Sequence, residues 1–224
     1  NPTTLNIFHL ISEYSCTTLW HYKNKFNTVI IKHLQLLNKV ICKGVKTKVL
    51  MLNFPTNPTG SIAPKETLEA IAKICIKHDL FVLTDEIYSE LRYDDEEHTS
   101  IASLPGMKER TLLLHGFSKA FAMTGWRVGY AAARKDIIKA MIKVQGQVTS
   151  CATSVAQKAA HGALVGSQEA TENMVKAFRE RRDFVCSRLR EIPNISFAEP
   201  HGAFYVLVDI TAYLGKSYEG KVIA

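Results

Sequence analysis

The sequence of 224 residues lacks any uninterrupted apolar stretch near the ~18 residues that a membrane-spanning helix needs. It also lacks the basic and then apolar layout of a signal peptide at its amino end. Hydrophobic residues make up 46% of the chain, which is enough to bury a sizeable core. We therefore expect a soluble protein with no membrane partner, built from one large domain and part of another.

Cysteine is scarce and follows no pattern. The five cysteines are odd in number and form no Cys-x-x-Cys pair; they are Cys16, Cys42, Cys75, Cys151 and Cys186. Disulfide frameworks and zinc sites need paired, regularly spaced cysteines, so this usage favours reduced thiols and predicts a cytoplasmic location.

Metal and nucleic-acid signals are weak as well. The acidic run at residues 94–98 lacks the spacing of metal ligands, which favours an acidic surface loop and no metal site. The formal net charge is +7, and residues 179–190 form the densest basic stretch. Glu180 and Asp183 are interleaved there, so a solvated helix face is favoured over a nucleic-acid partner.

Apolar patterning predicts alternating strands and helices. Strands are expected at residues 49–52, 80–83, 112–116 and 128–132, and helices at residues 64–78, 135–144, 154–165 and 168–191. Pro193 ends the last of these helices. The alternation is typical of an α/β protein.

Lys119 is the residue that points most directly to chemistry. It follows the expected strand 112–116, and open α/β sheets bind ligands at the carboxyl ends of their strands. A lysine amine with a reference pKa of about 10.4 needs an apolar or cationic setting to react near neutrality, and it can then hold an aldehyde cofactor as a Schiff base. Arg127, eight residues later, suits a phosphate group.

Two further clusters follow expected strands. Asn57 comes after the strand 49–52, where Pro58 restricts its backbone and Gly60 permits a turn. Asp85 and Tyr88 follow the strand 80–83. Taken alone, Asp85 suits a helix cap and Asn57 an Asx turn, just as Arg127 alone suits a surface ion pair. Their occurrence together with a lysine favours a binding site.

With these residues in this order, the chain resembles the class I aminotransferases of the aspartate aminotransferase fold, which depend on pyridoxal 5'-phosphate. The match runs from about residue 46 to about residue 207. The resemblance implies an α/β fold: a three-layer α/β/α large domain with a mostly parallel sheet, followed by the start of a small α+β domain.

The same resemblance implies a division of the chain. We expect a divergent segment at residues 1–45, a cofactor-binding large domain at 46–166, a long interdomain helix at 167–192 and a partial small domain at 193–224. Residues 202–209 are expected to begin the small-domain sheet, and residues 29–37 to form a helix.

The catalytic roles are also implied by the resemblance. Lys119 corresponds to the lysine that forms the Schiff base and then moves the substrate proton. Asp85 corresponds to the carboxylate that keeps the ring nitrogen protonated, so that the ring accepts electrons. Asn57 and Tyr88 correspond to the pair that hydrogen-bonds the phenolic oxygen of the ring.

The phosphate site follows in the same way. Ser118 and Arg127 correspond to phosphate ligands, while Gly116 stands where relatives carry a serine. The aromatic rings of Trp126 and Phe121 are expected to pack in the core and not to stack on the cofactor.

The implied activity is transfer of an amino group between an L-amino acid, aspartate by default, and a 2-oxo acid such as 2-oxoglutarate. The implied assembly is a homodimer. Family members are longer, and the arginine that binds the substrate carboxylate is not expected among these 224 residues. Two alternatives stay open: a pyridoxal-dependent C–S lyase or other enzyme on the same fold, and a truncated chain without catalysis.

Overall fold

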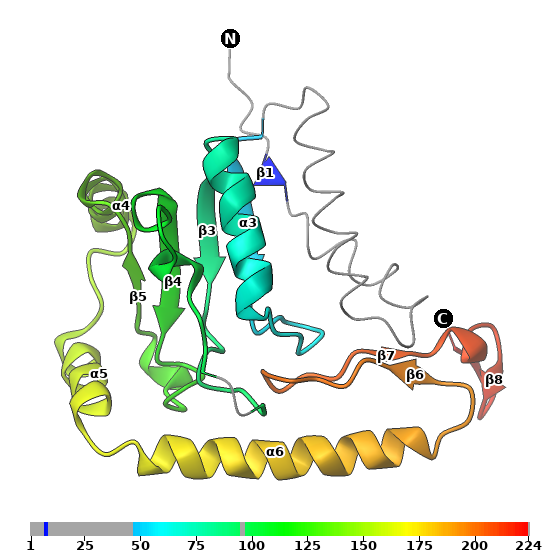
Figure 1. Cartoon of the computed structure of the whole chain (residues 1–224). Coiled ribbons are helices and arrows are strands. Elements are labelled where there is room, and N and C mark those ends of the chain that lie inside the picture. The colour runs from blue at the N-terminus through cyan, green and yellow to red at the C-terminus, as the bar shows by residue number, and fades with distance from the viewer. Residues whose placement is uncertain (1–6, 9–46, 95–96, 224) are drawn as a thin grey trace.

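The chain folds around a five-stranded sheet in which the strands follow one another in the order β1-β2-β3-β4-β5 (Figure 1). The computed structural model describes residues 7–8, 47–94 and 97–223. Strands β1 to β4 run parallel, and β5 is antiparallel to β4. The strand bounds are β1 (Ile7–Phe8), β2 (Val49–Asn53), β3 (Phe81–Asp85), β4 (Thr111–Gly116) and β5 (Gly129–Ala132). The prediction of an α/β fold with a mostly parallel sheet is confirmed.

Four longer helices follow or connect these strands: α3 (Lys65–Lys77), α4 (Lys135–Val148), α5 (Ser154–Val165) and α6 (Glu169–Arg190). All four were predicted. α4 continues beyond its predicted end at residue 144, because no proline or turn residue stops it before Thr149. Four single-turn 3₁₀ helices lie in the loops, at Ile101–Ser103, Lys108–Arg110, Thr124–Trp126 and Thr211–Tyr213. No helix in the described ranges is long and apolar enough to cross a membrane.

The main core lies between the sheet and α3, which covers β2 and β3 on one face (Figure 1). Alternate residues of the strands point to this helix, so Leu50, Leu52 and Val82 are buried there. The helix contributes the residues predicted from its 3.6-residue spacing, namely Leu68, Ile71, Ala72 and Cys75. This packing fixes the carboxyl ends of β2 and β3 side by side.

The last part of the chain lies below the sheet in the view of Figure 1. There α6 runs along the bottom, and the chain returns through β6 (Ser196–Phe197) and β7 (Val208–Asp209), which pair antiparallel. Strands β8 (Ser217–Tyr218) and β9 (Lys221–Val222) form a second hairpin. The division into large domain, interdomain helix and partial small domain stays a prediction, and the expected helix at residues 29–37 lies outside the described residues.

Of residues 202–209, which were expected to begin the small-domain sheet, only Val208–Asp209 is a strand, and it pairs with β6. The preceding residues bond to loops of the large sheet instead. The Gly202 amide donates to the Gly60 carbonyl at 2.9 Å, and the Ala203 amide donates to the Leu91 carbonyl at 2.8 Å. These bonds use the donors that a small-domain strand needs.

Two further expectations need correction. Trp126 is 47% exposed and does not pack in the core, although Phe121 packs on Phe117 with ring centroids 5.6 Å apart, as predicted. The run at residues 94–98 is not wholly a surface loop. Asp94 forms an ion pair with Arg92, and local pairing of this kind satisfies a carboxylate without a metal.

The basic face of α6 is balanced by acidic partners, as predicted. The Arg188 guanidinium lies 2.5 Å from the Glu191 carboxylate, and Arg190 pairs with Glu199. Arg182 also pairs with an acidic residue, Asp183, but its side chain is only 13% exposed and it donates in addition to the Pro200 carbonyl at 3.0 Å. Arg182 therefore ties α6 to the segment that leads back to the sheet.

Candidate cofactor site

The topology brings the predicted site residues to one edge of the sheet. β2 and β3 are in register from Val49 and Phe81 to Asn53 and Asp85, so their carboxyl ends coincide. β4 runs parallel to β3 and ends beside them. Because β5 is antiparallel and its first residue pairs with the last residue of β4, the turn before β5 lies at the same edge. Asn57, Asp85, Ser118, Lys119 and Arg127 all lie in or just beyond these strand ends.

Asp85 is the last residue of β3, and only one of its two carboxylate oxygens accepts a hydrogen bond within the described residues. Its Oδ1 accepts a hydrogen bond from the Ile87 amide at 3.1 Å, which is the turn-capping role that the residue suits when taken alone. Its carbonyl accepts from the Asn53 side chain at 3.1 Å. Within the described residues, Oδ2 accepts no hydrogen bond. The backbone is thus fixed at both sides, and one acceptor remains for a ligand.

Lys119 lies in the turn after β4, and its amine is surrounded by aromatic rings. The Nζ atom lies 5.8 Å from the centroid of the Tyr88 ring and 5.1 Å from that of Phe204. No carboxylate in the described part of the chain pairs with this amine. The Lys119 amine is thus held beside two aromatic rings, with no carboxylate in the described ranges to bind it, and remains available to a ligand.

Tyr88 is a buried phenol, with 4% of its surface exposed. Its hydroxyl lies 2.6 Å from the hydroxyl of Tyr205. Burial raises the pKa of Tyr88 above its usual value of 10.0, and the hydrogen bond shared with Tyr205 and the nearby charge of Asp85 raise it further in the chain without a ligand. Tyr88 is therefore a neutral phenol at physiological pH and can donate a proton in a hydrogen bond.

The remaining predicted residues present free donors at the same edge. The side-chain amide of Asn57 and the hydroxyl of Ser118 have no hydrogen-bond partner among the residues described. The Asx turn expected at Asn57 is closed by Asn53 instead, whose Oδ1 accepts a hydrogen bond from the Asn57 backbone N–H at 2.9 Å. The Arg127 guanidinium donates one bond, to the Thr124 carbonyl at 2.9 Å, and pairs with no carboxylate in these ranges. Within the described residues no hydrogen bond joins these three residues to Lys119, whose amine lies against the rings of Tyr88 and Phe204.

The sequence analysis missed two residues of the site, Phe204 and Tyr205. The rings of Phe204 and Tyr88 meet edge to face, with centroids 5.3 Å apart. Both missed residues follow Gly202, where an added Cβ would lie 2.7 Å from Pro55 side-chain atoms. The sequence does carry a pattern here: Gly202 is followed by a small residue and two aromatic residues, and apolar and polar residues do not alternate. Such a pattern indicates a segment whose backbone packs closely against another backbone.

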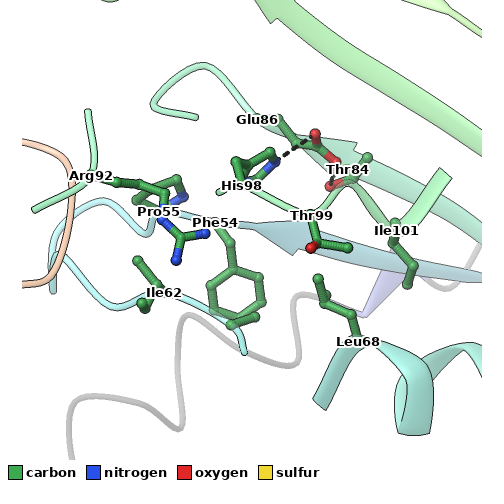
Figure 2. Close-up of a pocket in the computed structure, with 11 residues that line it drawn as sticks. Phe54, Pro55, Ile62, Leu68, Thr84, Glu86, Arg92, His98, Thr99 and Ile101 are labelled. Carbon is green, nitrogen blue, oxygen red and sulfur yellow. Dashed lines mark hydrogen bonds and ion pairs between the residues drawn. The ribbon is translucent and has the colours of Figure 1, made fainter. Parts of the chain in front are cut away.

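A small cavity, lined by both apolar and polar side chains, lies on the opposite face of the sheet and is separate from this site (Figure 2). Successive side chains of a strand alternate between faces, so Thr84 points toward α3 while Asp85 points away from it. The buried Glu86 carboxylate accepts hydrogen bonds from Thr84 at 3.1 Å, from Ser100 at 2.8 Å and from the His98 ring at 2.8 Å. The expectation of a surface loop is thus also wrong for His98, because this buried carboxylate draws the imidazole inward.

The functional groups at this edge of the sheet indicate a class of ligand. It combines a lysine amine, a free carboxylate oxygen, a phenol, an amide, a guanidinium and a hydroxyl. This set meets the needs of a phosphorylated aromatic aldehyde with a ring nitrogen and a ring hydroxyl. The fold and the site thus define an α/β protein with a lysine-centred cofactor site.

Comparison with known proteins specifies the family. The family model described as "Aminotransferase class I and II" matches residues 11–220. An aspartate aminotransferase of Pinus pinaster is 51% identical over 177 residues, which is 77% of this chain and 36% of the relative. One of Bacillus subtilis is 44% identical over 162 residues, which is 72% of this chain and 41% of the relative. The chain belongs to the class I and II aminotransferase family, whose cofactor is pyridoxal 5'-phosphate.

Solved structures agree with this assignment. The aspartate aminotransferase from Rhizobium meliloti superposes with a TM-score of 0.78 at 36% identity, over 85% of this chain and 48% of that one. An aromatic aminotransferase from Pyrococcus horikoshii gives a TM-score of 0.72 at 43% identity, over 79% of this chain and 46% of that one. The chain thus spans less than half the length of these relatives.

Proposed function

We propose that this chain supplies the cofactor site of a pyridoxal 5'-phosphate-dependent aminotransferase. The observation that carries the proposal is the Lys119 amine, held against Tyr88 and Phe204 at the edge of the sheet where Asp85 keeps a free carboxylate oxygen. The donor and acceptor are an L-amino acid and a 2-oxo acid. Relatives named aspartate aminotransferase support aspartate as the default donor, and 2-oxoglutarate is the acceptor in this proposal.

The catalytic roles follow from the groups that each residue leaves free. Lys119 would hold the cofactor through its amine, and the free amine would move a proton at the substrate carbon. Asp85 would accept from the ring nitrogen through its unoccupied oxygen and would favour the charged form of that nitrogen. When bound, the cofactor supplies the electron sink for the bond that breaks. Tyr88 and Asn57 donate to the ring oxygen and orient the ring.

The phosphate would be bound by Arg127 and Ser118. A guanidinium offers parallel N–H donors that match phosphate oxygens, and the serine adds a neutral donor. The hydroxyl that a serine would add at position 116 is absent. A Cβ there would lie 3.1 Å from Ile87 and 3.2 Å from the Gly129 Cα, so the close approach of β4 and β5 favours glycine.

We further propose a homodimer in the cytoplasm. Apolar side chains on α4 and α5 are exposed in the isolated chain, including Val148 at 75% and Val155 at 67%, which supports burial of these faces in a larger assembly. Cys75, Cys151 and Cys186 are free thiols, as a reducing compartment requires. The lyase alternative has no observation in its favour, since the relatives described above are aminotransferases.

Reduction of the loaded chain with borohydride tests the proposal. We expect an absorbance band on addition of pyridoxal 5'-phosphate, which borohydride fixes to one peptide that contains Lys119. Lys119→Ala should abolish the adduct and leave the fold intact, whereas Lys158→Ala, at an exposed position of α5, should keep it. A reducible adduct that persists in Lys119→Ala would rule out this assignment, and a chain that forms no adduct would support the alternative of a truncated chain without catalysis.

A further inference from the structure

The hydroxyl of Tyr88 has a partner from a distant part of the chain. Tyr205 lies 117 residues later, and the two hydroxyl oxygens are 2.6 Å apart. The rings meet edge to face, with centroids 5.7 Å apart. Tyr205 belongs to the segment between β6 and β7, which extends toward the lower edge of the sheet (Figure 1). The pair therefore connects this returning segment to the lysine-centred site.

The position of Tyr205 is fixed by its surroundings. The preceding residues Gly202 and Ala203 are hydrogen-bonded to the carbonyls of Gly60 and Leu91. The Tyr205 ring also belongs to a cluster with buried Leu91 and with Phe178 of α6. A hydroxyl held by its own backbone and ring can set the orientation of a neighbour's hydroxyl.

Counting protons gives the direction of the hydrogen bond. Each tyrosine hydroxyl has one proton to donate and can also accept. If Tyr88 donates its proton to a ligand on Lys119, it has none left for Tyr205. Tyr205 must then donate to Tyr88, and the two hydroxyls form a chain that ends at the ligand. In such a chain each bond polarises the next one and strengthens it.

We propose that Tyr205 is a positioning residue for Tyr88: its hydroxyl donates to the Tyr88 oxygen and directs the Tyr88 proton toward the ligand bound at Lys119. This inference rests on the proposed function, because it needs a ring oxygen beside Lys119 to accept that proton.

The charged groups near Tyr88 define what else can affect its hydroxyl. Asp85 precedes it in the same turn and acts on it electrostatically, and the Lys119 amine lies 5.8 Å from its ring. The side chains of α6 that pack against the cluster containing Tyr88 are apolar, namely Met174, Val175 and Phe178. Replacing Tyr205 with phenylalanine removes the hydroxyl and leaves these groups in place.

The experiment is a pH titration of the absorbance of the bound cofactor in Tyr205→Phe, Tyr88→Phe and the double variant. Without Tyr205, Tyr88 donates more weakly, and the ring oxygen is less stabilised as an anion. The proton held beside that oxygen is then released at higher pH, so we expect the midpoint to rise by about 0.5 pH unit. In the Tyr88→Phe background the same change should shift nothing. Tyr213→Phe, whose hydroxyl donates to the Pro193 carbonyl, is the matched control and should leave the midpoint unchanged.

An unchanged or lowered midpoint in Tyr205→Phe, or an equal shift in both backgrounds, would overturn the inference. Thermal unfolding of the cofactor-free chain tests the contact separately. The losses in midpoint temperature of the two single variants should be non-additive by about 2 °C in the double variant. Additive losses would overturn the positioning role alone, whereas failure of the wild-type chain to form an adduct at Lys119 would overturn the proposed function and this role with it.

Discussion

At the scale of single residues, Asp85 shows how a side chain can serve the fold and a ligand together. One oxygen caps the turn that follows β3, and the other has no partner in the described ranges. Arg127 shows the same division, because one nitrogen bonds to the Thr124 carbonyl and the rest of the guanidinium stays free of carboxylates there. These partial commitments orient each side chain before a ligand arrives.

Arg127→Ala should weaken cofactor binding without preventing the covalent bond to Lys119. A charge-assisted hydrogen bond to phosphate contributes about 1.5–3 kcal/mol, so we expect the Kd to rise roughly ten- to hundredfold. The Kd is measured by absorbance titration with pyridoxal 5'-phosphate. Arg134→Ala is the matched control, since Arg134 forms a surface pair with Asp136 at the start of α4. Equal affinities of the Arg127 variant and the wild type would contradict a phosphate role.

At the scale of elements, the site depends on how loops at the sheet edge pack on each other. Gly60 has a positive φ of 67°, which glycine adopts without strain, and its carbonyl receives the amides of His201 and Gly202. A Cβ at this position would lie 2.2 Å from the Pro200 Cβ. The loop after β2 and the segment after β6 are therefore in direct backbone contact, and glycine permits this.

Gly60→Ala should lower the free energy of unfolding by about 2–4 kcal/mol, because the clash with Pro200 adds to the backbone strain. Gly146→Ala is the control, since a Cβ there meets no atom within 4 Å. Gly146 lies inside α4, so its replacement should raise the free energy of unfolding by about 0.5–1 kcal/mol. Urea unfolding measures both values, and a neutral Gly60→Ala would show that the two loops do not pack as described.

At the scale of the whole molecule, the three described cysteines differ in how far they are buried. Cys75 lies on the buried face of α3 and is fully buried, Cys186 is buried on α6, and Cys151 is exposed between α4 and α5. Burial raises the pKa of the Cys75 thiol from its usual 9.0 to about 12, although the nearby Arg110 charge opposes this effect. Burial also raises the pKa of Cys186.

Iodoacetamide at pH 8 should therefore label Cys151 in the native chain and leave Cys75 and Cys186 unlabelled until denaturant is added. Peptide mass spectrometry measures the labelling, and rapid labelling of Cys75 in the native chain would contradict its burial in the core.

Since the folded thiol of Cys75 holds its proton more tightly than the unfolded one, its contribution to stability is complete below pH 9 and is lost as the pH rises toward 12. The free energy of unfolding should fall by about 1 kcal/mol between pH 9 and pH 10, and this fall should be absent in Cys75→Ala.

The sequence by itself determined the elements and the edge at which the site lies. Local periodicity located β2 to β5 and the four longer helices, because burial of one face leaves a short-range pattern. It also placed Asn57, Asp85, Ser118, Lys119 and Arg127 near strand ends, since a parallel sheet collects such ends at one edge. Neighbouring residues gave the elements, whereas the parallel sheet and the choice of Ser118 came from the family resemblance.

Only the tertiary structure decided which distant groups meet. Tyr205 reaches Tyr88, and His98 reaches buried Glu86, through backbone paths that local patterns do not encode. An aromatic residue such as Trp126 looks the same in sequence whether it is buried or 47% exposed. The physical reason is that hydrogen bonds and burial depend on packing between segments far apart in the chain, whereas periodicity reports only the face that one segment presents.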